Sequence, residues 1–305
     1  MTELKLKWGN RILFLTIVMM IGIQFLMVFM GIDDTMAIVM GTQLCVLLIP
    51  LIGTKICGVK VRETLRIRSV SVVSLVFVFL IAFCSFPIIS LLNVISMFFV
   101  ENEVAGVAMA MYPHGLVLAM FVMAVMPAVG EEILMRGVVY RSYQRKSPVF
   151  ALFASAVIFG LIHMNFNQMP YAIFLGIVMV LLVEATDSIL SSMFLHFLIN
   201  GFSTMAGYFT AHTVETQVQG ESGPWTVQIM PYVIMSVIMV PALIFLILAL
   251  FRINGRKIKD VFKKKDQVRE ISNGDEVKKK ERVVDIWLIL AVLISVIITA
   301  ISTFA

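Results

Sequence analysis

The sequence predicts an all-α fold, a polytopic transmembrane helical bundle of about eight or nine spans. Of the 305 residues, 60% are hydrophobic and only 14% are charged, whereas soluble domains are about 45–50% apolar. Apolar runs long enough to cross a bilayer, about 17–25 residues each, recur along the chain. The basic residues are confined to alternate connections between these runs.

Nine apolar runs are candidate spans. The fifth run is short and the second contains Pro50, so these two are the weakest as full crossings. In chain order, the runs cover residues 11–31, 36–53, 70–98, 115–135, 148–163, 170–185, 188–210, 227–251 and 284–304.

The distribution of Lys and Arg predicts the orientation of the bundle. All 24 basic residues lie in the first eleven positions or in the segments 55–68, 136–146 and 252–282. The connections between these segments, which would face outward, contain none. Because Lys and Arg accumulate in cytoplasmic loops, we expect an integral, multi-pass cell-membrane protein with a cytoplasmic N-terminus. This orientation accounts for the net charge of +5, with the lipid bilayer rather than nucleic acid as the basic residues' partner.

The polar residues divide the chain into three zones. Residues 1–114 are expected to form N-terminal transmembrane helices with a basic cytoplasmic segment. Residues 211–305 are expected to form two spans separated by a Lys-rich cytoplasmic loop. The zone between them, 115–210, carries nearly all the polar groups placed inside spans, and we expect it to be the catalytic core.

Two adjacent carboxylates, Glu131 and Glu132, lie inside an otherwise apolar span, where an ionisable residue indicates a functional site. Arg136 follows Glu132 by four residues in the favourable orientation for a helical ion pair. Glu131 points about 100° around the helix and has no partner nearby in the sequence. We therefore expect Glu132 and Arg136 to support the structure and Glu131 to act as a general base.

Two further spans carry polar pairs with a spacing of four residues, Phe159 with His163 and His196 with Asn200. At about 1.5 Å per residue, Glu131, His163, His196 and Asn200 are expected at a similar depth in the membrane. These residue types suit hydrolysis by activated water: Glu131 takes a proton, His163 assists, and His196 with Asn200 stabilises an oxyanion.

A zinc site is the alternative chemistry, with Glu131, His163 and His196 as three ligands and water at the open position. The metal-free mechanism, which requires no cofactor, is favoured because a helical HExxH pair is absent and because an Asn beside a His suits an oxyanion donor.

The ordered motifs Glu131-Glu132-x-x-x-Arg136, Phe159-x-x-x-His163 and His196-x-x-x-Asn200 resemble those of the CPBP family. This family includes the eukaryotic CAAX prenyl endopeptidase (CAAX prenyl protease type II) and the bacterial Abi and bacteriocin-immunity proteins. The resemblance implies an intramembrane endopeptidase, often labelled a metalloprotease, with Glu131 as base assisted by His163 and with His196 and Asn200 at the oxyanion site. Its partner would be a peptide or a membrane-protein substrate.

Two other functions stay open at this point. A non-catalytic immunity or chaperone-like membrane protein would keep the same polar residues as structural contacts between helices. A proton-coupled transporter would use Glu131 and the histidines as a relay, although the chain lacks the repeated halves and paired broken helices typical of transporters. The sequence favours no particular oligomeric state.

Overall fold

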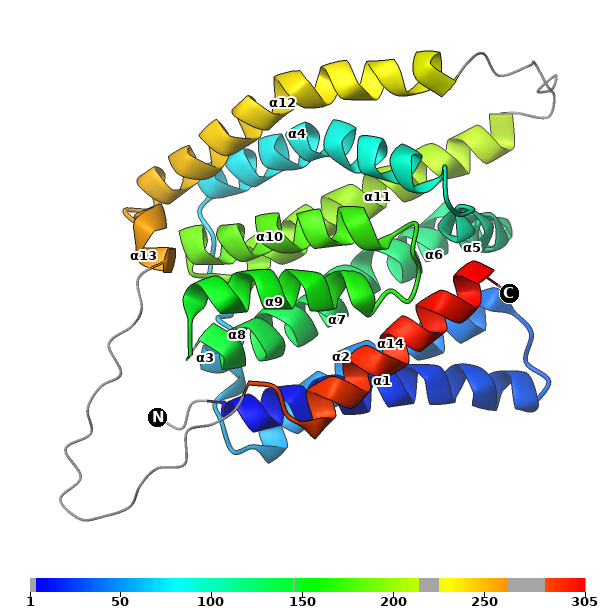
Figure 1. The fold of residues 1–305 in the computed structure, drawn as a ribbon, viewed down its shortest axis with the longest axis horizontal. Helices are drawn as coiled ribbons and strands as arrows, with labels where there is room; N and C mark the ends of the chain where they lie inside the picture. The colour runs from blue at the N-terminus through cyan, green and yellow to red at the C-terminus, as the bar shows by residue number, and fades with distance from the viewer. Residues whose placement is uncertain (1–3, 145, 214–224, 263–282, 305) are drawn as a thin grey trace.

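The protein is a bundle of long antiparallel helices, as the computed structural model shows (Figure 1). The structure describes residues 4–144, 146–213, 225–262 and 283–304. Within them, eight helical segments are long and apolar enough to cross a membrane, which confirms the expected all-α class. The fifth apolar run forms a helix of only 14 residues, α9 (Pro148–Leu161), shorter than a typical span.

The bundle has one basic end. Helices α3 and α13 and the start of α1 lie at this end, whereas α5 and the end of α14 lie at the opposite end (Figure 1). The helices flanking the central segments are α1 (Leu6–Phe29), α2 (Thr35–Ile56), α3 (Val61–Thr64), α4 (Val72–Ser96), α5 (Glu103–Met111), η1 (Tyr112–His114), α12 (Trp225–Ile253), α13 (Ile258–Phe262) and α14 (Ile286–Phe304).

Local side-chain bonds set several helix starts. Asp34 accepts hydrogen bonds from the backbone N–H groups of Met36 and Ala37 at the start of α2, and the Ser71 hydroxyl accepts one from Ser74 at the start of α4. Such caps satisfy N–H groups that have no partner within the helix. Helix α2 continues through Pro50, so the second apolar run is a single helix.

The buried centre consists of three elements: the segment Leu116–Gln144, α10 (Met169–Thr186) and α11 (Ile189–Thr213). In each, at least half of the most apolar stretch is buried, compared with 17–22% in α1, α2, α12 and α14. Helix α9 packs tightly on α10, because a Cβ on Gly176 would lie 2.8 Å from the Cα of Ala156. The predicted zone of polar residues therefore coincides with the core of the bundle.

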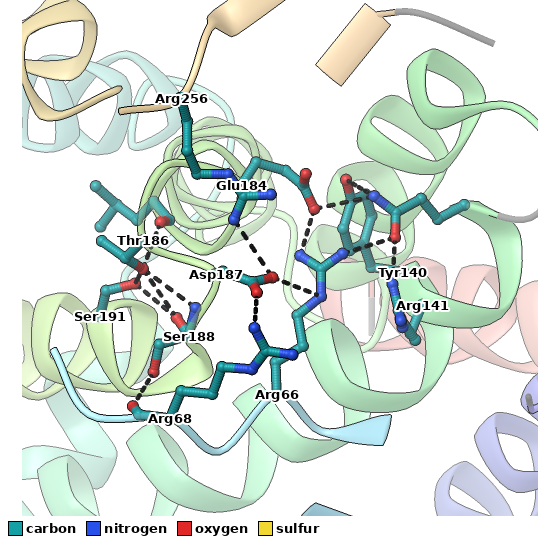
Figure 2. A network of polar contacts seen from close by, with 12 residues as sticks. Arg66, Arg68, Tyr140, Arg141, Glu184, Thr186, Asp187, Ser188, Ser191 and Arg256 are labelled. Atoms are coloured by element: carbon teal, nitrogen blue, oxygen red, sulfur yellow. Dashed lines mark hydrogen bonds and ion pairs between the residues drawn. The ribbon is translucent and has the colours of Figure 1, made fainter. Parts of the chain in front are cut away.

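A network of arginines and carboxylates ties the basic end together (Figure 2). Buried Arg66 donates to Glu184 at 2.5 Å and to Gln144 at 3.0 Å. Asp187 lies in the turn between α10 and α11 and pairs with Arg66 at 3.5 Å, with Arg256 at 3.3 Å, and with Arg68. Asp187 immediately precedes the apolar run 188–210 and, as an Asp, is expected to cap the following helix, but this expectation is wrong.

Two backbone features explain this correction. Asp187 has a left-handed conformation, with φ of 54°, and it ends α10 rather than beginning α11. Its carboxylate is directed to the arginines, and the hydroxyl of Ser188 instead accepts the N–H of Leu190. The basic segment 55–68 is partly enclosed by the bundle, because Leu65 and Arg66 are both buried.

Candidate active site

The two carboxylates lie in a helix with irregular winding. The segment Leu116–Gln144 consists of α6 (Leu116–Met120), η2 (Phe121–Val125), α7 (Met126–Glu132), η3 (Ile133–Tyr140) and α8 (Arg141–Gln144). Both η2 and η3 are π-helical. Because π-helical turns often occur at functional sites, their position on both sides of α7 marks the pair Glu131 and Glu132.

Glu132 belongs to a fully buried ion pair. Its Oε1 accepts a hydrogen bond from Nη1 of Arg136 at 2.7 Å, and the two side chains are 0% and 2% exposed. The Arg136 guanidinium also lies 4.4 Å from the centre of the Phe159 ring and donates to the carbonyl of Gly176 at 3.4 Å. This environment links the helix of Glu132 to α9 and α10.

Glu131 faces the two histidines. Its Oε2 lies 3.7 Å from Nε2 of His163 and 3.9 Å from Nε2 of His196. The same oxygen is buried and has no hydrogen-bond partner among the described residues. Three groups that the sequence places on separate helical segments are thus brought together.

The other ring nitrogen of each histidine has a fixed partner. Nδ1 of His163 lies 2.6 Å from the carbonyl oxygen of Phe159, and Nδ1 of His196 lies 3.1 Å from Oε1 of Glu132. An oxygen that only accepts hydrogen bonds requires a proton on the facing Nδ1. In the neutral form, both rings therefore present an unprotonated Nε2 toward Glu131.

The Phe159 ring packs against both histidines and against Arg136. Its ring makes edge contacts with both imidazoles, with centroids 4.8 Å from His163 and 6.0 Å from His196. One aromatic ring thereby contacts the two histidines and Arg136. Asn200 is partly buried, and its Nδ2 donates to the carbonyl of Met123 in η2 at 3.1 Å, which leaves its second N–H for another acceptor.

The described residues contain no group of three or more His, Cys, Asp or Glu side chains arranged to hold a metal ion. The zinc set expected as the alternative, Glu131, His163 and His196, is not such a group, and zinc dependence stays a prediction. We therefore derive no step through a metal.

The loop after His163 contains contacts that sequence reasoning missed. Met164 has φ of 51°, and buried Asn165 donates from Nδ2 to Oε2 of Glu103 in α5 at 2.7 Å. Ser302 in α14 donates to the carbonyl of Met164 at 3.2 Å. The closely spaced Asn165, Asn167 and Gln168 indicate a turn, but nothing in the sequence indicates Glu103 as its partner.

The fold and the site define the class of protein: a multi-pass membrane protein whose acidic and imidazole groups meet inside its helical core. Residues 113–202, about a third of the chain, match the family described as Type II CAAX prenyl endopeptidase Rce1-like. The matched stretch is similar to this family of CAAX-type endopeptidases and includes every motif residue from Glu131 to Asn200. Neither the curated proteins nor the solved structures gave a match.

Proposed function

We propose that the protein is an intramembrane endopeptidase that hydrolyses a peptide bond in or near the bilayer, with Glu131 as the general base. The observation that supports this proposal most strongly is the convergence of His163 and His196 on one oxygen of Glu131. A purely structural cluster would be expected to pair its groups directly, as Glu132 and Arg136 do.

The separations suit a water molecule as the nucleophile. At 3.7 Å, Oε2 of Glu131 and Nε2 of His163 are too far apart for a direct hydrogen bond. A water molecule placed beside them is within hydrogen-bonding reach of both atoms. In the proposed step, Nε2 of His163 accepts a hydrogen bond that orients the water, and Glu131 takes a proton as the water oxygen attacks the peptide carbonyl carbon. Glu131 then passes this proton to Nε2 of His163, which gives it to the leaving amine nitrogen as the C–N bond breaks.

His196 and Asn200 are the proposed oxyanion donors. With Nδ1 already donating to Glu132, His196 donates from Nε2 only as an imidazolium, in which both nitrogens carry protons. Because Glu132 already neutralises Arg136, the carboxylate of Glu131, 3.9 Å from Nε2 of His196, supplies the balancing negative charge. The free N–H of Asn200 is the second donor, and together they stabilise charge that develops on the carbonyl oxygen.

The substrate is proposed to be a peptide or a membrane protein. Cleavage of a peptide library by the purified protein in liposomes tests the proposal. Glu131→Gln is expected to lower the rate by at least a hundredfold, as removal of a general base does. Glu63→Gln, at an exposed site on α3, is the matched control and should cleave like wild type. Cleavage by Glu131→Gln at the wild-type rate would refute the assignment.

A chelator series tests the zinc alternative with the same substrates. In the proposed mechanism, cleavage is unchanged after chelation and metal removal. Loss of cleavage that returns on addition of zinc would replace this mechanism with a metal-dependent one.

A further inference from the structure

The basic end of the bundle contains a cavity that is separate from the candidate active site. It lies where α12 passes into α13 and has a volume of about 360 Å³, within the range of about 300–1,000 Å³ typical of small-molecule pockets. Three cationic side chains, Arg252, Arg256 and Lys257, line it together with the apolar residues Leu248, Phe251 and Ile258.

A sharp turn brings the basic side chains together. Gly255 has φ of 66°, a conformation that glycine adopts without strain. The N–H of Gly255 donates to the carbonyl of Arg252, and that of Arg256 donates to the carbonyl of Phe251. The last carbonyls of α12 are thus already satisfied, so the polar groups left to contact a ligand are mainly the cationic side chains.

Positive charge exceeds negative charge around this cavity. The neighbouring network in Figure 2 sets three guanidiniums, those of Arg66, Arg68 and Arg256, against the carboxylates of Glu184 and Asp187. Arg252 and Lys257 are exposed and take no part in the ion pairs of this network. An anion bound in the cavity would balance this excess.

The cavity lies at the end of the candidate membrane span of α12. The candidate span of α12 ends at Ile253, next to Arg252. Leu248 lines the cavity and is exposed, as are Ile244 and Phe245 farther along the same helix. A ligand with an anionic head and an apolar tail would contact both parts.

We propose that this cavity binds the headgroup of an anionic phospholipid. Its phosphate contacts Arg252, Arg256 and Lys257, and its acyl chains lie along the exposed apolar surface of α12. Basic pockets at the ends of membrane spans suit such headgroups. The proposal is independent of the proteolytic function, because its evidence and its test concern lipid binding alone.

The test measures binding of short-chain phosphatidylglycerol to the delipidated full-length protein in neutral detergent by native mass spectrometry. The pocket variant is Arg252→Gln/Lys257→Gln. The matched control is Lys60→Gln/Arg62→Gln, which removes the same charges from exposed positions at α3. Each basic residue near a lipid surface contributes about a fivefold change in affinity. The pocket variant should therefore bind about 25-fold more weakly, whereas the control should bind within twofold of wild type.

Three results would overturn the proposal: wild-type affinity in the pocket variant, an equal loss in both variants, or wild-type binding of phosphatidylcholine as tight as that of phosphatidylglycerol. Inorganic phosphate, titrated alone, separates a lipid from a free anion. Saturation by phosphate with the same dependence on Arg252 and Lys257 would show that the apolar wall contributes nothing, and would overturn the lipid assignment. Thermal unfolding of each variant verifies that both fold.

Discussion

The neighbouring carboxylates Glu131 and Glu132 are predicted to differ in how the same substitution changes the free energy of unfolding. Glu132→Gln removes the negative charge from a pair that is 0% and 2% exposed and leaves the Arg136 guanidinium buried beside Phe159. Removal of one partner of a buried ion pair costs about 3–5 kcal/mol. We expect the free energy of unfolding of Glu132→Gln to fall by about this amount.

Glu131→Gln should have little effect on folding. Its Oε2 has no hydrogen-bond partner among the described side chains, and glutamine has nearly the same shape as glutamate. The change in the free energy of unfolding should stay within about 1 kcal/mol, although the variant loses cleavage.

A second substitution tests whether the unpaired charge is the cause. In Glu132→Gln/Arg136→Met, both charges are absent and the methionine side chain can pack on Phe159, so much of the lost stability should return. Reversible unfolding in mixed detergent micelles gives the free energy of unfolding of the wild type, of Glu132→Gln, of Arg136→Met and of the double variant. A loss below about 1 kcal/mol for Glu132→Gln, or no recovery in the double variant, would refute the reasoning.

Three further predictions concern other parts of the fold. Burial raises the pKa of Asp187, but the three surrounding guanidiniums outweigh this effect and hold that pKa below its ordinary value of 3.8. Its contribution to stability is therefore complete above about pH 4 and lost as the pH falls through the lowered pKa, and the difference in unfolding temperature between wild type and Asp187→Asn should shrink only below pH 4. Gly176→Val should destabilise the protein by at least about 1–3 kcal/mol in detergent unfolding, because its Cβ would lie 2.8 Å from the Cα of Ala156; unchanged stability would contradict the close packing. Asn165→Ala should remove the hydrogen bond to Glu103 and lower kcat more than it raises KM, with Asn165→Asp and wild type as the comparison, whereas an unchanged kcat would show that this contact does not position the loop.

The composition and the charge pattern suffice to predict the helical class. Inside a bilayer no water can hydrogen-bond to the backbone, so an apolar run must pair its own N–H and C=O groups. Helices therefore follow directly from the apolar runs. The meeting of Glu131, His163 and His196 could also be predicted, because their spacing and estimated depth place them in one layer of the membrane. Their roles in catalysis stay predictions.

The missed features depend on contacts between distant parts of the chain. Arg66 and Glu184 are 118 positions apart, and no local pattern joins them. Asp187 has the residue type and position of an N-cap, but three arginines from other segments attract its carboxylate. Residues 98–114 were expected to be only a connection, yet they include α5, whose Glu103 contacts the loop after His163. A local reading of the sequence cannot supply these partners.

The length of α7, which lies between two π-helical segments, is critical to the site. Each residue added to or removed from a helix rotates everything beyond it by about 100°. A π-helical turn holds one more residue than an α-helical turn, so η2 and η3 could absorb a deletion by returning to regular winding, whereas a single deletion within α7 itself would turn Glu131 relative to one half of its own helix by that angle. The amino acids at the site would all remain, but the carboxylate and its anchoring contacts would no longer face in their present directions. In this protein, the number of residues in one helix is therefore as strict a requirement as the identity of its acidic residues.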